Sequence, residues 1–270
     1  MKPVRILTIA GSDSGGGAGI QADLKTITVL GGFGMSVITA LTAQNTLGVH
    51  GIHDVPPAFV AAQFDAVAAD IGVDAAKTGM LATSEVIRVV AGKIGDYGIE
   101  RLVVDPVMVA KGGTSLIREE AKKTMIAELI PLAFILTPNL PEAEVLSEMT
   151  ISTLDDMKAA ARVIRNLGAE NVVLKGGHLA GDAVDLLYDG MHFRTFSSPR
   201  IETSDTHGTG CTYSAAIATL LGRGMDVAGA VEEAKRYITA AIRQAWRIGG
   251  GHGPTNHLAP LFKTDGGSGK

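Results

Sequence analysis

The chain has 270 residues, and its 24 basic and 28 acidic side chains give a net charge of −4 at pH 7. With 4% aromatic residues and no long basic run, it lacks the basic face or stacking aromatics of most nucleic-acid binders, so we expect no nucleic-acid partner. A single cysteine allows no internal disulfide, and no apolar run reaches the ~18 residues of a membrane span, which together favour a cytoplasmic protein with no membrane partner.

The first half of the chain alternates between strand-like and helix-like segments. Helical spacing is clearest at Val60, Phe64, Val67 and Ile71, which would share one face of a helix. In chain order, the sequence predicts strand 4–10, helix 18–30, strand 35–43, helix 59–71, strand 75–78, helix 83–94, strand 102–105, helix 119–130, strand 133–137 and helix 141–147.

The second half continues the alternation, with one interruption. It predicts helix 153–167, strand 171–175, a hairpin of strands 183–188 and 192–197, and helices 209–221 and 227–246. Repeated strand–helix alternation predicts an α/β fold with a largely parallel sheet covered on both faces. No break in composition divides the chain, so we expect one domain over residues 1–263. Residues 264–270 are polar and glycine-rich and are predicted to be a disordered tail.

Polar and glycine-rich segments follow several of the predicted strands, which is where parallel sheets bind ligands. The first runs from Gly11 to Gly19 and partly matches a dinucleotide-binding pattern. The next strand ends at Gln44, with no acid to hold a ribose hydroxyl, so a backbone wall against a small substrate is favoured instead. The Gln44 amide can donate and accept hydrogen bonds, which suits a heteroaromatic ring bearing an amine.

Charged and amide side chains at three other strand ends leave alternatives open. Asn139 and Glu142 are three residues apart, so they could organise Mg²⁺ or simply cap a helix, and both roles can coexist. Asp105 is either a turn former or a charge that faces the site. Lys175 either meets a phosphate or is a surface lysine at a turn.

The segment from Asp205 to Cys211 opens a small-residue helix. Gly208, Thr209 and Gly210 lie where backbone N–H groups lack helical partners and the helix dipole is positive, which predicts an anion site. A thiol at such a position can have its pKa lowered and act as a base or nucleophile. The combination suggests phosphoryl transfer, while His207 could shape the backbone or take part in chemistry.

Five segments carry a resemblance to a known family: AGSDSGGGAGIQAD (10–23), KTGML (77–81), DPVM (105–108), TPNLPEA (137–143) and THGTGCT (206–212). Over residues 4–258 the chain resembles the ribokinase superfamily, and within it the hydroxymethylpyrimidine kinase / phosphomethylpyrimidine kinase family of thiamine biosynthesis. The resemblance implies a ribokinase-like three-layer αβα sandwich with a mostly parallel central sheet. It also implies a homodimer that uses ATP and Mg²⁺ to phosphorylate 4-amino-5-hydroxymethyl-2-methylpyrimidine and then its monophosphate.

The resemblance also implies roles for individual residues. Cys211 would take the proton from the substrate hydroxyl, beside the anion site of Gly208, Thr209 and Gly210. Contacts with the pyrimidine are expected from Gln44, Gly11, Asp23, Met80 and Val107. Contacts with the nucleotide are expected from Asp105, Asn139, Lys175 and Thr206, and metal binding from Glu142. Residues 107–116 are the candidate lid.

Two other functions remain as alternatives at this stage. The related bacterial pyridoxal kinases also carry a cysteine at the position of Cys211, although the family typically replaces the glutamine that Gln44 represents. A non-catalytic protein that binds a vitamin precursor would share the cavity but release no ADP.

Overall fold

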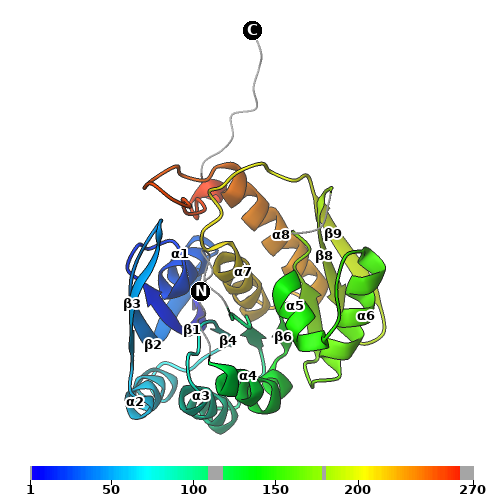
Figure 1. Cartoon of the computed structure of the whole chain (residues 1–270). Helices are drawn as coiled ribbons and strands as arrows, with labels where there is room; N and C mark the ends of the chain where they lie inside the picture. Colours follow the sequence, from blue (N-terminus) through cyan, green and yellow to red (C-terminus); the bar gives the residue numbers. More distant parts are fainter. Residues whose placement is uncertain (1, 109–117, 178–180, 262–270) are drawn as a thin grey trace.

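The computed structural model describes residues 2–108, 118–177 and 181–261 (Figure 1). The candidate tail 264–270 and all of the candidate lid except Val107 and Met108 lie outside these residues, as does His178.

In the described part of the chain the strands form one sheet of nine, in the order β3-β2-β1-β4-β5-β6-β7-β8-β9. The central strands pair in parallel, while β3, β8 and β9 are antiparallel to their neighbours. The strands are β1 Val4–Asp13, β2 Gly32–Asn45, β3 Gly48–Asp54, β4 Ala75–Thr78, β5 Leu102–Val104, β6 Ile135–Leu136, β7 Asn171–Leu174, β8 Ala183–Tyr188 and β9 Phe193–Ser198.

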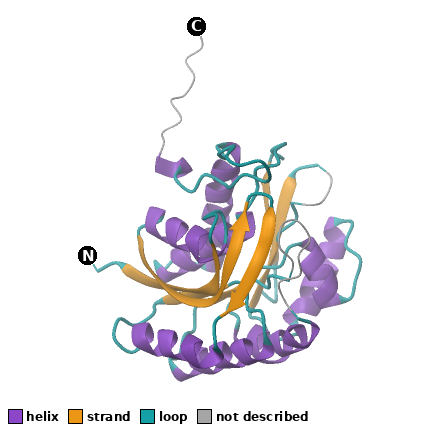
Figure 2. Cartoon of the chain, turned by 60° about the vertical axis from the view of Figure 1, so that its left-hand side comes forward, coloured by secondary structure: helices purple, strands orange, loops and turns teal. Residues whose placement is uncertain are grey.

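Helices cover both faces of this sheet and create three layers (Figure 2). One face carries α1 Gly19–Val29, α7 Thr209–Gly222 and α8 Val227–Arg243. The other carries α2 Pro57–Ala68, α3 Ser84–Asp96, α4 Glu119–Thr124, α5 Leu140–Ser147 and α6 Leu154–Arg165. A π-helical turn, Met125–Leu129, and a 3-10 turn, Ile130–Leu132, extend α4, and a short 3-10 helix covers Ala259–Leu261.

Each face of the sheet has its own apolar core. Leu7 and Ile9 of β1 pack with α2 and α3, whereas Ile6 packs on the opposite face with α7 and α8. This division follows from the two-residue repeat of a strand, which directs successive side chains to opposite faces. A nearly continuous apolar strand is therefore what a sheet buried on both sides requires.

Local signals in the sequence set several helix starts. Thr83 caps α3 by accepting a hydrogen bond from the Val86 N–H at 3.3 Å. Thr153 and Asp156 form a reciprocal capping box at the start of α6, which satisfies N–H groups that have no helical partner. The expected helix 83–94 and helix 153–167 are thereby confirmed to within a few residues.

The structure corrects the prediction at the edge of the sheet that β3 forms. The strand Gly48–Asp54 was not expected, because its glycines and histidines give no apolar alternation. It forms by antiparallel pairing with β2, and backbone pairing at an edge needs little from the side chains. The first two strands also run on to Asp13 and Asn45, past a register shift between Ala10 and Ser12.

This topology gathers the polar strand ends at one edge. The order of strands along the chain runs outward from β1 in both directions. Helices α1 and α3, which follow the neighbouring strands β1 and β4, therefore lie on opposite faces of the sheet. Such a reversal opens a crevice at the carboxyl ends of the strands. None of the helices in the described part of the chain has the length and hydropathy needed to span a bilayer.

Candidate active site

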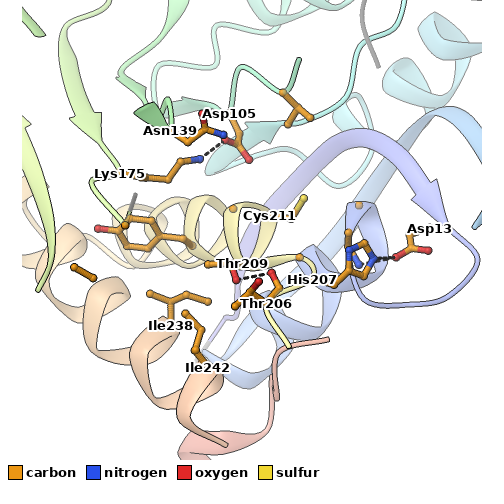
Figure 3. Close-up of a pocket in the computed structure, with 18 of the residues that line it drawn as sticks. Asp13, Asp105, Asn139, Lys175, Thr206, His207, Thr209, Cys211, Ile238 and Ile242 are labelled. Atoms are coloured by element: carbon orange, nitrogen blue, oxygen red, sulfur yellow. Dashed lines mark hydrogen bonds and ion pairs between the residues drawn. The ribbon is translucent and has the colours of Figure 1, made fainter. Parts of the chain in front are cut away.

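A cavity of about 600 Å³ opens at the carboxyl ends of the central strands. Figure 3 shows Asp13 and His207 at one side of it, Ile238 and Ile242 at the other, and Cys211 between them. All but one of the predicted site residues line it, namely Gly11, Gln44, Met80, Asp105, Val107, Asn139, Glu142, Lys175, Thr206, Gly208, Thr209, Gly210 and Cys211.

The glycine-rich loop is held in shape by one carboxylate. Asp13 accepts hydrogen bonds from the backbone N–H groups of Gly15 at 2.8 Å, Gly17 at 3.0 Å and Ala18 at 2.8 Å. His207 lies 2.8 Å from the same carboxylate. Burial would raise the pKa of Asp13, but these hydrogen bonds outweigh it and lower the pKa. The Asp13–His207 contact fastens the loop after β1 to the loop before α7, which gives His207 a shaping role.

Gln44 and Met80 form the wall beside this loop. The Gln44 side chain accepts a hydrogen bond from the Thr42 hydroxyl at 3.2 Å and lies 3.4 Å from the His207 ring. Thr39 donates to the Met80 carbonyl at 2.8 Å and fixes the methionine backbone. Both side chains line the cavity, so the structure offers an amide and a thioether to a flat ring.

The start of α7 forms the floor of the cavity. Gly208 precedes the helix with φ of 79°, and a Cβ there would collide with the carbonyl oxygen of Gly17. Only glycine accepts both the left-handed conformation and this close approach. The Thr209 N–H and hydroxyl both donate to the Thr206 carbonyl, at 3.3 and 2.8 Å. The Thr209 amide is thus already engaged, and the predicted anion site rests on the N–H groups of Gly210 and Cys211.

The structure corrects the expected acidity of Cys211. Burial raises the pKa of the thiol to about 11, and Lys77 counteracts this only in part. The position at a helix N-terminus predicted a lowered pKa, but desolvation of the charged form is the larger effect here. Cys211 is therefore a thiol whose thiolate depends on the cations around it.

Asp105 and Lys175 face one another across the cavity edge (Figure 3). Their side chains form an ion pair at 2.8 Å, and Lys175 is only 15% exposed. Ser214 and Thr137 each donate a hydroxyl hydrogen bond to Asp105 at 3.3 Å. Burial alone would raise the pKa of Asp105, yet Lys175 and its other partners lower it. Both residues are thus charges that face the site, and the surface-lysine alternative is excluded.

Asn139 and Glu142 form the capping box that one of the two interpretations expected. The Asn139 side chain accepts from the Glu142 N–H at 2.9 Å, and the Glu142 carboxylate accepts from the Asn139 N–H at 2.8 Å. Burial raises the pKa of Glu142 to about 7. A nearby cation would relieve the cost of charging this carboxylate.

The side chains that could bind a metal ion limit how such an ion could be held. Within the described residues, no group of three or more His, Cys, Asp or Glu side chains is arranged to hold a metal. Mg²⁺ keeps several waters and is often bound through one or two carboxylates plus phosphates. Glu142 and Asp105, both at the cavity edge, fit that second arrangement.

Asp23 is the exception among the predicted substrate contacts. Its side chain is fully buried in α1, pairs with Lys77 at 3.0 Å and accepts the Thr8 hydroxyl at 2.6 Å. It does not line the cavity, so its position does not support a direct contact with substrate. Its helical spacing from Ile20 and Ile27 is the signal that places this acid on the buried face of α1.

Residues at the α8 side of the cavity were missed. Lys235 forms an ion pair with Asp185 at 2.9 Å, and both line the cavity with Tyr213. Ile238 and Ile242 continue the same wall one and two turns along α8. Their spacing of 235, 238 and 242 marks one helical face, but nothing local showed which ligand or core that face would meet.

Comparisons with known proteins agree with this site. The model of the family described as "Phosphomethylpyrimidine kinase" matches residues 13–256. A hydroxymethylpyrimidine/phosphomethylpyrimidine kinase of Bacillus subtilis is 52% identical over 261 residues, covering 96% of each chain. The thiamine biosynthesis bifunctional protein ThiED of Geobacter sulfurreducens is 60% identical over 254 residues; the match covers 94% of this chain but 52% of that longer protein.

Among solved structures, the ADP complex of Bacillus subtilis pyridoxal kinase superposes with a TM-score of 0.90 at 42% identity, covering 96% of this chain and 99% of that one. This likeness confirms the ribokinase-like three-layer fold expected from the sequence. The family match spans most of the chain and includes the loop after β1, the Asn139–Glu142 cap and the start of α7. The chain therefore belongs to the phosphomethylpyrimidine kinase family.

Proposed function

We propose that the protein transfers the terminal phosphoryl group of ATP to 4-amino-5-hydroxymethyl-2-methylpyrimidine, and then a second one to the monophosphate, in thiamine biosynthesis. One observation carries the proposal: a single cavity joins the Gln44–Met80 wall to the start of α7 and continues to α8. A small ring and a nucleotide can thus meet end to end at Cys211. The named activity of the relatives supports the same reaction.

In this reaction the pyrimidine lies between the loop after β1, Gln44 and Met80. The thiolate of Cys211 accepts the proton of the hydroxymethyl group, whose oxygen forms the new bond to the γ-phosphorus while ADP leaves. The N–H groups of Gly210 and Cys211 stabilise charge on the transferring group. Phosphoryl transfer depends mainly on such positioning and electrostatics, so few covalent participants are needed.

The nucleotide end of the site combines positive and negative groups. Lys175 is close to the start of α7, because a Cβ at Gly210 would lie 3.5 Å from its ammonium nitrogen. It can therefore turn from Asp105 to the phosphates when ATP binds. Mg²⁺ supplies charge neutralisation on the phosphates. Glu142 and Asp105 would hold it, through water.

The test is release of ADP by the purified protein with three acceptors: the pyrimidine alcohol, its monophosphate, and pyridoxal. We expect turnover with both pyrimidines and at most weak turnover with pyridoxal. Cys211→Ala, purified in parallel, controls for contaminating kinases. Binding of the pyrimidine without ADP release would instead support a non-catalytic binding protein.

Pyridoxal kinase is the second candidate, because a kinase with that name shares the fold at 42% identity. Gln44 separates the two candidates, since it presents an amide that can read the pyrimidine amine and ring nitrogen. Gln44→Ala should raise KM for the pyrimidine alcohol well above its effect on KM for ATP. An unchanged KM for the pyrimidine would remove Gln44 from base recognition.

We also propose a homodimer in the cytoplasm, as the family resemblance implies. Large apolar side chains at the β2–β3 edge are exposed, among them Leu41, Leu47 and Ile52. Exposed apolar clusters of this kind favour contact with a partner. Analytical ultracentrifugation tests the oligomer, and a monomer at micromolar concentration would contradict it.

A further inference from the structure

A buried ion pair lies beneath the reactive cysteine and has no part in the scheme above. Lys77 of β4 and Asp23 of α1 are both 0% exposed and approach to 3.0 Å. Thr8 of β1 donates its hydroxyl to Asp23 at 2.6 Å. Lys77 and Thr8 are register partners on adjacent parallel strands, so their side chains rise from the same face of the sheet.

That face is the one covered by α1 and α7. Ala75 packs with α7 and Ala76 with the opposite core, so strand alternation directs Lys77 with Ala75 towards α7. Its ammonium group reaches towards the carboxyl end of β4, because a Cβ at Gly79 would lie 2.8 Å from its nitrogen. The cation therefore points from the core towards the end of the sheet that carries the cavity.

The start of α1 links this pair to the thiol. The Gly19 N–H lowers the pKa of the Cys211 thiol and so lies near it, and Gly19 and Asp23 are one helical turn apart on the same face of α1. The start of α7 also rests on the start of α1, since a Cβ at Gly208 would lie 3.3 Å from the Ala18 Cα. The Lys77–Asp23 pair is thus one turn of α1 away from the end of that helix that meets the start of α7.

We propose that Lys77 is a positioning residue for phosphoryl transfer: its ammonium group, fixed by Asp23 and Thr8 beneath α7, stabilises the thiolate of Cys211. This role rests on the proposed function, because only a kinase needs the thiolate as a base. Removing two charges from water is rarely repaid in stability, and buried pairs can often be replaced by apolar residues at no loss. A fully buried lysine therefore calls for a role beyond packing.

The charges around the thiol favour Lys77 for this role. Burial would lower the pKa of Lys77, but Asp23 and Cys211 act in the opposite direction and raise the pKa, which keeps the ammonium protonated. Asp23 and Asp105 oppose the thiolate, and Lys77 is the cation that most strongly favours it. Cys211 also raises the pKa of Lys175, but Lys175 borders the cavity and is available to phosphates. Lys77 is fully buried, so it stays with the cysteine throughout the reaction.

The experiment measures the thiolate directly. Cys211 is the single cysteine of the chain, so mass spectrometry of the intact protein follows its alkylation alone, and only the thiolate reacts. The first variant is Lys77→Met, which removes the cation; Lys77→Met/Asp23→Asn, which removes the pair without leaving one buried charge, is the second. Lys93→Met, which breaks the Lys93–Asp65 pair between α3 and α2, is the control for losing an ion pair far from the site.

At about pH 8 we expect Lys77→Met to react with iodoacetamide at least tenfold more slowly than the wild type, since one pKa unit changes the thiolate fraction about tenfold. The double variant should be slowed by a smaller factor, because it also loses the Asp23 charge that opposes the thiolate. The reaction with N-ethylmaleimide, a larger reagent, should be slowed by the same factor in each variant. Lys93→Met should react with both reagents at the wild-type rate. A wild-type rate in folded Lys77→Met, or in the double variant if Lys77→Met does not fold, overturns the proposal. So does slowing confined to the larger reagent, which would report access to the thiol instead of its charge.

Kinetics separate this proposal from the proposed function. Both variants should lose kcat for the pyrimidine alcohol, with the rise of the pH–rate profile moved to higher pH and KM for ATP unchanged. A purely structural pair would lower the amount of folded enzyme but leave that pH profile in place, and this result also counts against Lys77. If the wild type releases no ADP while the alkylation rates behave as expected, the proposed function fails and the Lys77–Cys211 coupling stands.

Discussion

At the scale of single residues, Cys211 has a different chemical role in each of the two proposed steps. The alcohol must lose a proton in the first step, whereas the monophosphate is already ionised, with a second pKa of about 6. We therefore expect Cys211→Ser to lower kcat for the alcohol by roughly 10²–10⁴, the usual effect of a lost general base. It should lower kcat for the monophosphate much less. Initial rates with each acceptor at saturating ATP measure both values.

The same variant contains its own control, because the monophosphate step reports whether the site is intact. Equal loss in both steps would show that Cys211 shapes the site instead of accepting a proton. Near-normal turnover of the alcohol would remove Cys211 from the chemistry. No phosphocysteine should be trapped in either step, since the thiolate takes only a proton.

Glu142 predicts a pH dependence of stability in the nucleotide-free protein. Its pKa rises from 4.5 to about 7 on folding because the side chain is buried. The folded state therefore holds this proton more tightly, and stability is lost as pH rises from 4.5 through 7. Relative to Glu142→Gln, the wild type should lose roughly 2–3 kcal/mol of unfolding free energy between about pH 5 and pH 8.

Chemical denaturation at several pH values measures this difference for wild type and variant. Glu120→Gln, at an exposed position in α4, is the matched control and should follow the wild-type curve. A constant difference between wild type and Glu142→Gln over the whole range would mean that Glu142 has an ordinary pKa and is not poised for a cation.

The sequence predicted which residues line the site far better than it predicted their ionisation. Gln44, Met80, Lys175 and Glu142 all reach the cavity as expected, because each lies at the carboxyl end of a parallel strand or in the segment after it, and these ends lie at the same edge. The acidity of Cys211 had the opposite sign to the prediction, since it depends on how deeply neighbouring elements bury the thiol. No local pattern carries that information.

At the scale of elements, α7 depends on one glycine. Gly208 has φ of 79°, and a Cβ there would meet the carbonyl of Gly17. We expect Gly208→Ala to cost at least ~1–2 kcal/mol from the left-handed conformation alone, and more from the collision. The same change should weaken ATP binding, because it displaces the start of α7. Thermal unfolding and isothermal titration with ATP measure these two effects.

Gly92 supplies the matched control for that substitution. It lies in the exposed face of α3, and a Cβ there would meet nothing within 4 Å. Gly92→Ala should stabilise the protein by about 0.5–1 kcal/mol through the unfolded state and helix propensity. If Gly208→Ala and Gly92→Ala had the same effect on stability, the start of α7 would not require a glycine at position 208.

Helices and buried strands were predicted well, and the edge of the sheet was not. The strand Ala75–Thr78 and the hairpin at Asp189 and Gly190 agree closely with the structure, because apolar runs and turn residues mark them locally. The strand Gly48–Asp54 exists only through its pairing with β2. Contacts between segments, and not local pattern, decide such an element.

At the scale of the whole molecule, both apolar cores share the strands of one sheet. Ile6 and Leu7 are adjacent in β1 yet belong to opposite cores. Unfolding of either core would therefore destabilise strands on which the other core also depends. We expect the chain to unfold as the single domain predicted from the sequence, with coincident transitions by Trp246 fluorescence and far-UV circular dichroism.

The measurement is a urea titration followed with both probes on the same samples. Trp246, the only tryptophan, follows α8 and reports that face, while circular dichroism reports all helices. Two separated midpoints would show that the α1–α7–α8 face unfolds independently. In that case the chain would behave as two cooperative units despite its single sheet.

The late position of α7 in the chain has a consequence for synthesis. Residues 209–222 cover strands that begin at Val4, and His207 reaches back 194 positions to Asp13. A ribosome-bound chain must therefore complete about four fifths of its length before α7 covers its part of that face of the sheet. Until then Ile6, Ile27 and Val103 would be open to water or to a chaperone. Translation rate and chaperone supply, more than intrinsic stability, should then set the yield of active enzyme.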